Sequence, residues 1–360
     1  MRVAPLQRAD LPAAEVILGQ ACAHDRAARV AEEKLFEPGP SSAPKPGEPV
    51  SLIAPVPIAV YDDRTMVGVA AACGKWLRVL AVVPGARGRG AGTALLEACM
   101  DAGARRTLDQ PGNYLAPGID VTNTEAIAWL EKRGWTRTGD PRTNVLIRVR
   151  GNPRVSRDRA DELARFARAR GYEVRRANLA EWPLLDAVAG EFGGAWPHEL
   201  SRSLEFVPGP RPEFAGVADP AAFARQFSSA DLPRVSPPPD VEAKLRAQVG
   251  DDTANAMLTM WRAKLRNAVP AVHVALKDGA YCAFAAHDGN NAGLGWFGPT
   301  GTWPAHRGQG LGEALLVACL ADVGEHHEFC EVAWIGPRPF YDKVAGIESE
   351  RQFVVLSRPD

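Results

Sequence analysis

The sequence predicts an α/β protein made of two copies of one domain. The first observation is a glycine-rich loop that occurs twice, as "VVPGARGRGAG" from Val82 and "TWPAHRGQGLG" from Thr302, at an offset of 220 residues. The second is a fainter match of "VAPLQRADLP" from Val3 with "VRRANLAEWP" from Val174, at an offset of 171. Strand-like and helix-like segments surround both loops in the same order. A chain of 360 residues suits two such domains.

The two offsets define the expected domain boundaries. We expect a first copy over residues 1–150, a linker helix within 151–171, and a second copy over 172–360. The linker reads "SRDRADELARFARARG", a polar helix ending at a glycine. Because the offsets differ by 49 residues, the second copy must hold an insertion, placed at about 198–269. It contains two proline-rich stretches, "EFVPGPRPEFAG" and "LPRVSPPPD", and then a helical pattern, "DTANAMLTMWRAKLRNAV".

The elements follow one order in both copies, beginning with a strand and a helix. In the first copy, "TMVGVAAACG" and "WLRVLAVVP" are rich in strand-forming residues. After the glycine loop, "GTALLEACMDAGARR" places Leu95, Leu96 and Cys99 on one helix face. A strand "YLAPGIDV", a helix "TEAIAWLEKRG" and a strand "TNVLIRVR" complete the copy. The second copy repeats this order with "AGLGWFGPTGTWP", "EALLVACLADVG", "FCEVAWIG", "RPFYDKVAG" and "RQFVVLSR".

Composition excludes several classes of function. The chain is 46% hydrophobic and 24% charged, with a net charge of −1, so no basic surface suggests a nucleic-acid partner. It has no apolar run long enough to cross a membrane and no signal-peptide pattern at its start. The six cysteines lack metal-ligand or redox spacing. We therefore expect reduced, mostly buried thiols in a cytoplasmic protein, and no metal site.

Each glycine loop has the features of a phosphate-binding site. It lies between a strand and a helix, so the free N–H groups of the first helical turn lie at the positive end of the helix dipole and can bind a phosphate. Glycine lets backbone approach phosphate oxygens, and the arginine before it can add charge-assisted hydrogen bonds. The loops lack the Gly-Lys-Ser/Thr of a P-loop, and their Gly-x-Gly-x-Gly spacing differs from that of the dinucleotide fingerprint.

These two loops, with "NTEAIAWLEKRGW" and "PFYDKVAGI" downstream, resemble the acyl-CoA-binding motif and next helix of the GNAT N-acetyltransferases. The resemblance covers both halves, so the whole chain is similar to tandem GNAT proteins, including glucosamine and glucosaminide N-acetyltransferases. It implies two domains, each with a mixed, mostly antiparallel twisted sheet flanked by helices, and acetyl-CoA as cosubstrate. The implied CoA-binding residues are Thr302, Trp303, Arg307, Gly308, Gln309, Gly310, Leu311 and Gly312 in the second copy, and Val82, Val83, Arg87, Gly88, Arg89, Gly90, Ala91 and Gly92 in the first.

The resemblance also points to the second copy as the catalytic one. GNAT enzymes usually protonate the leaving thiolate with a tyrosine, and Tyr341 matches that position, whereas the first copy has Leu130 there. The tyrosine-to-glycine spacing is five residues here instead of the usual four. The amides of Thr302 and Trp303 are the expected oxyanion donors. Glu331 is the first candidate for the general base, with His287 and Asp288 as alternatives.

The expected acceptor is the primary amine of a small molecule. An amino sugar is the first candidate, on the resemblance and on the aromatic residues in or near the segments that line the acceptor side, which are Trp196, Phe206, Trp261, Trp296 and Trp334. An antibiotic or another metabolite amine stays open. Two other readings stay open as well: a catalytically silent acyl-CoA sensor or scaffold, and a protein or peptide N-acetyltransferase. The first copy either binds CoA without turnover or is purely structural. The protein is expected to be a monomer or a homodimer.

Overall fold

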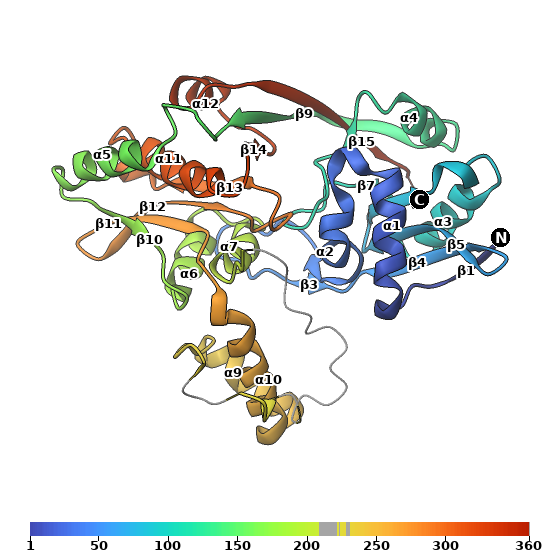
Figure 1. The fold of residues 1–360 in the computed structure, drawn as a ribbon, viewed down its shortest axis with the longest axis horizontal. Coiled ribbons are helices and arrows are strands. Elements are labelled where there is room, and N and C mark those ends of the chain that lie inside the picture. The colour runs from blue at the N-terminus through green and yellow to red at the C-terminus, as the bar shows by residue number, and fades with distance from the viewer. Residues whose placement is uncertain (209–221, 223, 228–230, 360) are drawn as a thin grey trace.

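The computed structural model describes residues 1–208, 222, 224–227 and 231–359 of the chain. Within them lies a 13-stranded sheet with the strand order β1-β4-β5-β6-β7-β15-β9-β14-β13-β12-β11-β10, and β8 pairs with β15 (Figure 1). Neighbouring strands are antiparallel except for the parallel pairs β6–β7 and β13–β14. The predicted α/β class with mostly antiparallel pairing is confirmed.

The strands of the first copy are β1 (Arg2–Pro5), β4 (Val56–Asp62), β5 (Thr65–Cys73), β6 (Trp76–Val82), β7 (Arg106–Thr107), β8 (Ile119–Asp120) and β9 (Thr136–Arg148). Those of the second copy are β10 (Glu173–Arg176), β11 (Val272–Lys277), β12 (Ala280–His287), β13 (Trp296–Thr302), β14 (Phe329–Val332) and β15 (Ser349–Ser357). A separate two-stranded sheet joins β2 (Gly39–Pro40) to β3 (Leu52–Ile53).

The helices follow the same division. The first copy has α1 (Leu11–Ala21), α2 (Ala31–Phe36), α3 (Ala91–Asp101) and α4 (Thr124–Glu131). The remainder has α5 (Arg157–Arg168), α6 (Trp182–Glu191), α7 (Trp196–Leu204), α9 (Pro239–Val249), α10 (Asp251–Lys264), α11 (Leu311–Gly324) and α12 (Arg338–Val344).

The two copies contribute their strands to the sheet in nearly mirror-image order. The last strand of each copy, however, lies in the half of the sheet that the other copy forms. Strand β9 of the first copy pairs with β14 of the second, and β15 of the second pairs with β7 and β8 of the first. The two exchanged strands pair with each other from Ser349↔Leu146 to Ser357↔Thr136 and run between the halves in Figure 1. The boundaries at 150 and 172 stay a prediction, and in the structure each half of the sheet is completed by a strand of the other copy.

Helices cover both faces of the sheet, and each half has two buried clusters. On one face, here called the loop face, helices α3 and α4 pack on the first half and α5, α11 and α12 on the second. On the opposite face, α1 and α2 cover the first half and α6 and α7 the second. Strands buried on both faces read as continuous apolar runs, which explains "VGVAAAC" in β5.

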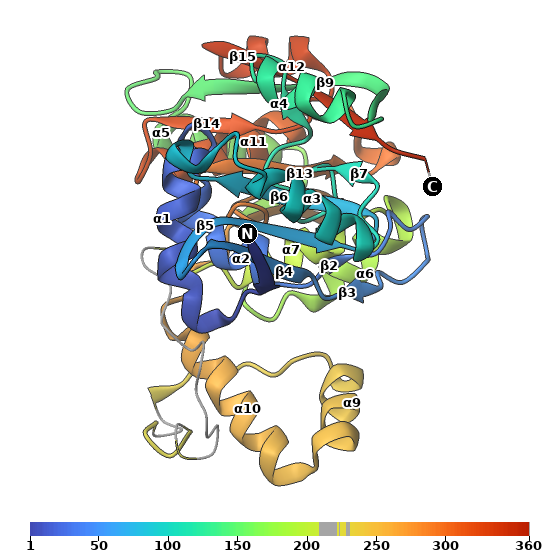
Figure 2. The same cartoon turned by 90° about the vertical axis from the view of Figure 1, so that its right-hand side faces the viewer.

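The linker and the insertion are both helical where described. Helix α5 lies within the predicted linker; the Ser156 hydroxyl accepts from Arg159 N at 3.1 Å, and Arg159 pairs with Glu313 of α11 at 2.9 Å. Helix α7 belongs to the core, since Leu200 and Leu204 are fully buried, so the added material begins after it. Helices α9 and α10 extend away from the sheet (Figures 1 and 2). Of the first proline-rich stretch, residues 209–216 lie outside the described residues.

Among the described residues, no helix combines the length and the apolar character that a membrane crossing requires. All six cysteines are free, and five of them are buried, as expected.

Candidate functional site

The two glycine loops share one backbone conformation. In each, the residue after the strand, Val83 or Trp303, has φ −54° and ψ 139°, and a short 3-10 turn follows. Gly88 and Gly90 have φ of +74° and +92°, and Gly308 and Gly310 have +76° and +78°. These left-handed angles strain any residue with a side chain, so the shared glycines are a backbone requirement.

Each loop leaves a cradle of free amides at the start of a helix. The first intrahelical bonds run from Ala94 N to Gly90 O at 3.0 Å and from Ala314 N to Gly310 O at 3.1 Å. The three preceding N–H groups therefore have no partner within the helix, and the glycines at the N-cap positions of α3 and α11 have no side chain to cap them. A Cβ built on Gly88 or Gly308 would meet nothing within 4 Å. This open, amide-lined space fits a phosphate group.

An arginine braces each loop from the same position. Arg87 Nε donates to Val82 O and Arg307 Nε donates to Thr302 O, each at 3.3 Å. In the first copy, Arg89 is also paired with Asp62 at 2.9 Å. In the second, Arg170 from beyond α5 donates to Gln309 O at 3.1 Å. Arg87 and Arg307 thus hold the conformation of each loop by hydrogen bonds to its backbone and also place a positive charge beside it.

The parallel strands ahead of each loop are paired only at their start. Trp76 and Leu77 pair with Arg106 and Thr107 in the first copy, and in the second Trp296↔Glu331 and Phe297↔Val332 are the two pairs. Among the described residues, the rest of β6 and β13 has no strand partner on this side, which leaves a gap in the sheet beside each loop. Backbone groups along this gap can bond a ligand.

The backbone amides of Thr302 and Trp303 face opposite sides of the chain at the end of β13. Trp303 N donates to Cys282 O at 3.0 Å, so it is engaged by β12 and does not serve as an oxyanion donor in this arrangement. Because successive residues of a strand direct their amides to opposite sides, Thr302 N–H points away from β12 into the gap. Of the two predicted donors, only the Thr302 amide is available.

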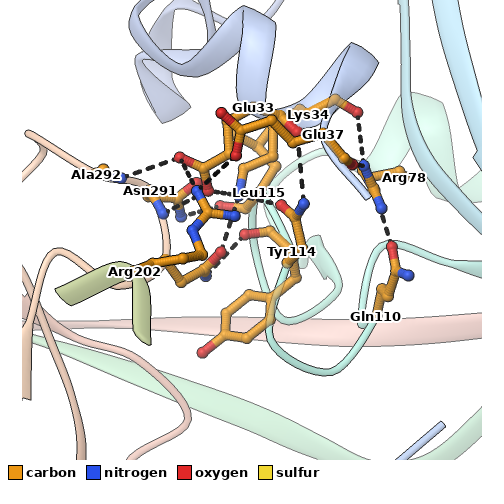
Figure 3. A network of polar contacts seen from close by, with 12 residues as sticks. Glu33, Lys34, Glu37, Arg78, Gln110, Tyr114, Leu115, Arg202, Asn291 and Ala292 are labelled. Carbon is orange, nitrogen blue, oxygen red and sulfur yellow. Dashed lines mark hydrogen bonds and ion pairs between the residues drawn. The ribbon is translucent and has the colours of Figure 1, made fainter. Parts of the chain in front are cut away.

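The gaps differ at the bulge where each begins. In the first copy, Arg78 occupies the bulge between Leu77 and Val79 and is fully buried. It donates to Gln110 Oε1 at 2.8 Å and to Glu37 O at 2.7 Å (Figure 3). The 220-residue offset places Gly298 at this position in the second copy.

Gly298 leaves this part of the second gap open. Its φ is +129°, and a Cβ built on it would meet nothing within 4 Å. The first gap is therefore filled from the opposite face by an arginine and its partners, whereas the second is open at the matching point.

Helix α12 places Tyr341 where α4 places Leu130. The residues just before them mark the alignment, because the Cβ built on Gly92 lies 3.5 Å from Trp129 and that built on Gly312 lies 3.7 Å from Phe340. The ring of Tyr341 packs on Phe297 at 6.2 Å between centroids, on the loop face of the sheet. Burial raises the pKa of Tyr341 to about 12, so its hydroxyl keeps its proton at neutral pH.

Glu331 lies on the opposite face from Tyr341. It precedes Val332, which packs with Tyr341, and successive strand residues point to opposite faces. Asn144 Nδ2 donates to its carboxylate at 2.6 Å, and Arg351 lies at 3.7 Å. Burial raises the pKa of Glu331, and these two partners offset part of that effect. A carboxylate held in this way favours a structural role over the predicted general base.

The alternative bases and the aromatic residues are dispersed. His287 bonds Asp288 at 2.8 Å and faces Asp322 of α11, so both belong to a buried ion cluster. Of the five predicted aromatics, Trp296 and Trp334 come together around Tyr114, at 6.0 and 6.1 Å. The others, which are Trp196, Phe206 and Trp261, contact Phe284, His287 and Trp182 instead.

Comparisons with known proteins identify this architecture. Residues 32–135 match the family described as Acetyltransferase (GNAT) family. A solved structure of a glucosamine N-acetyltransferase region in a fungal multi-domain beta-N-acetylglucosaminidase is 14% identical with a TM-score of 0.59, over 99% of this chain and 38% of that one. A tandem GNAT protein from the clavulanic acid biosynthesis pathway is 14% identical with a TM-score of 0.53, over 100% of this chain and 99% of that one.

The chain has the tandem GNAT fold. It spans little more than a third of the fungal protein, of which it covers 38%. A search of the curated proteins finds no match.

The GNAT family match falls on the first copy, which has Leu130 at the tyrosine position and Arg78 in its gap. The family match therefore covers the copy whose gap is filled and does not extend to the copy that has Tyr341 and Gly298. The contrast of Arg78 with Gly298 escaped the sequence analysis. Its signal was present, because the 220-residue offset that aligns the loops also aligns these two residues.

Proposed function

We propose that the chain is an acetyl-CoA-dependent N-acetyltransferase whose second copy acetylates the primary amine of a small molecule. The observation that carries the proposal is the contrast between two gaps beside equal loops. Only the second copy combines an open bulge at Gly298 with a protonated phenol at Tyr341.

The residues of the second loop fit the diphosphate of acetyl-CoA. The free amides of Leu311 and Gly312, the open space at Gly308 and the charge of Arg307 are suited to hold it. When bound, acetyl-CoA supplies an acetyl group on a thioester whose sulfur must leave with a proton.

Two groups of this chain are suited to the chemistry of the second gap. The Thr302 N–H points into the gap and is a donor for a developing negative oxygen. The Tyr341 hydroxyl carries its proton at neutral pH and can donate it as a general acid. They lie at the same gap because Thr302 ends β13 and Tyr341 packs on Phe297 of that strand.

The first copy is proposed to bind acyl-CoA without turnover. Its loop has the same open amides as the second, but Arg78 fills its gap and Leu130 offers no proton. These two residues favour a binding or sensing role for this half within an active enzyme.

The acceptor is proposed to be an amino sugar, with glucosamine as the first compound to test because the fungal relative is described as a glucosamine N-acetyltransferase region. Release of CoA thiol from acetyl-CoA is measured with glucosamine, with other small amines and with peptides. Turnover with small amines supports the proposal. Turnover with peptides alone indicates a peptide N-acetyltransferase, and binding of acetyl-CoA with no thiol release from any amine indicates a silent sensor.

A further inference from the structure

Building on the acetyl transfer proposed above, we propose that Glu199 takes the proton from the acceptor amine, and that the first copy keeps its carboxylate unpaired by binding Arg202. Sequence analysis did not single out either residue. Both lie on helix α7, on the face of the sheet opposite Tyr341.

Helix α7 lies along the second gap. One turn before Glu199, Trp196 packs on Phe284 at 6.0 Å, and Phe284 pairs with Gly301 of β13. Farther along, a Cβ built on Gly289 would lie 2.3 Å from the Glu199 carbonyl oxygen. The helix thus packs over β12 and the loop that leads into β13. In the proposed arrangement, an amine in the gap has the Glu199 carboxyl on one face and the Tyr341 phenol on the other.

The carboxyl of Glu199 is buried without a partner. The residue is 8% exposed, and within the described part of the chain its carboxyl oxygens make no hydrogen bond or ion pair. The pKa of Glu199 is raised to about 7, mainly by burial. Arg202 and Lys34 offset part of this rise, and Glu33 adds to it. Glu199 in turn raises the pKa of Tyr114, which is nearby on the loop between β7 and β8. A buried carboxyl that titrates near neutrality is suited to general base catalysis.

Glu199 lies three residues before Arg202 on the same helix, a spacing at which the two side chains could form an ion pair. Instead Arg202 Nη2 pairs with Glu33 at 3.0 Å and Glu37 at 3.2 Å, both from the first copy (Figure 3). Lys34 is engaged as well, with Glu33 at 2.6 Å and Asn113 at 2.9 Å. The two cations that lower the pKa of Glu199 are thus both bound by carboxylates or amides of the first copy.

The proton balance assigns one group to each side of the gap. The amine nitrogen bonds to the carbonyl carbon as the carbon–sulfur bond breaks. One proton passes from nitrogen to a carboxylate oxygen of Glu199, and one passes from Tyr341 Oη to sulfur. Solvent then returns a proton to Tyr341 and removes one from Glu199. No other reactant is needed.

The first test is the rate–pH profile with acetyl-CoA and glucosamine. Glu199→Gln should lower kcat/KM at least about 100-fold and remove the acid limb near pH 7, with the affinity for acetyl-CoA retained. Glu191→Gln, at an exposed position of α6, is the matched control and should behave as wild type. A Glu199→Gln enzyme with wild-type rate and acid limb would overturn the proposal.

The second test needs no acceptor. In protein labelled with ¹³C at glutamate carboxyls, the Glu199 signal, assigned by its loss in Glu199→Gln, should titrate near neutrality. Glu37→Gln should lower that pKa because it releases part of Arg202, and Glu33→Gln should do so more strongly if it folds. A wild-type pKa in the ordinary glutamate range, or one unmoved in the Glu37 variant, contradicts the proposal. If wild type fails to acetylate glucosamine, the amino-sugar acceptor is contradicted, while this titration still decides the state of Glu199.

Discussion

The two copies have the same loop and opposite gaps. Both present free helix amides, left-handed glycines and an arginine bonded back to the strand at 3.3 Å. Beside the first loop, Arg78 is buried among Gln110 and the carbonyls of α2 and Glu37, whereas Gly298 opens the second. In the proposed function, binding of the cosubstrate and turnover thus depend on different residues, and the first copy keeps the loop without the open gap.

The exchanged strands make each half of the sheet depend on the other copy. Strand β14, which borders the second gap, has β9 of the first copy as its other neighbour. The first copy also supplies Glu33, Glu37 and Tyr114 to the opposite face of the second. In the proposed function the first half supports and the second half reacts, and four predictions examine this difference.

The largest expected effect is on binding of acetyl-CoA. Gly310→Asp should abolish binding at the second loop, because an acidic side chain is forced into a left-handed position facing the phosphates. Gly90→Asp should remove only the binding at the first loop. Titration calorimetry should show one lost site in each variant, and CoA thiol release should stop only for Gly310→Asp. Two unchanged sites would mean that neither loop holds the diphosphate.

Next in size is the loss of the general acid. Tyr341→Phe should lower kcat by about 10- to 1,000-fold and leave the dissociation constant of acetyl-CoA nearly unchanged, because the phenyl ring keeps its packing on Phe297. Steady-state rates and calorimetry on the same preparations measure both. Leu130→Tyr should add no activity at the first loop while Arg78 is present. Full activity of Tyr341→Phe would remove the phenol from the mechanism.

A third variant addresses the filled gap. Arg78→Ala should reduce the free energy of unfolding by about 3 kcal/mol, because buried Gln110 and the Glu37 carbonyl lose their partner. Denaturant unfolding measures this, with Arg137→Ala as the exposed control, expected within about 0.5 kcal/mol of wild type. The turnover number should not change. A fall in turnover with no loss of stability would show that the first gap takes part in the reaction.

The smallest expected effect concerns an ion cluster around Asp322 of the second copy, which Arg157 of helix α5 joins at 2.5 Å. Asp322 accepts from Arg176 at 2.7 Å and contacts His273 at 2.8 Å; burial alone would raise its pKa, but these partners and His287 hold it well below the usual range. Its stabilising contribution is complete above the unfolded pKa of about 3.9 and is lost as pH falls through and below that value.

Asp322→Asn should therefore cost about 2 kcal/mol of unfolding free energy at pH 7 and flatten the decline of stability below pH 4. Asp101→Asn, at the exposed end of α3 in the first copy, is the control. Denaturant midpoints from pH 3 to 7 measure both. Parallel curves for wild type and Asp322→Asn would show that the cluster carries no net stability.

Much of this molecule could be predicted from local patterns in the chain. Two loops at a fixed offset were enough for the tandem α/β architecture and for the helix starts, because left-handed glycines and free amides are properties of the backbone within a few residues. The alignment of Tyr341 with Leu130 was likewise local, and the contacts of Phe340 and Trp129 with the third glycines agree with it. Glu331 was chosen by type and strand position, which carry no information about its partners Asn144 and Arg351.

The tertiary structure decided what depends on residues distant in the chain. The exchange of β9 and β15 is a choice between two nearly equivalent backbone pairings, and strand sequence alone does not distinguish them. The free carboxyl of Glu199 depends on Arg202 being bound by carboxylates more than 160 positions earlier in the chain, at Glu33 and Glu37. Backbone conformation is set by neighbouring residues, whereas charge pairing and burial are set by whatever the fold brings into contact. The repeat and its loops therefore follow from the sequence alone, while the burial of Arg78 and the unpaired carboxyl of Glu199 follow only from the folded chain.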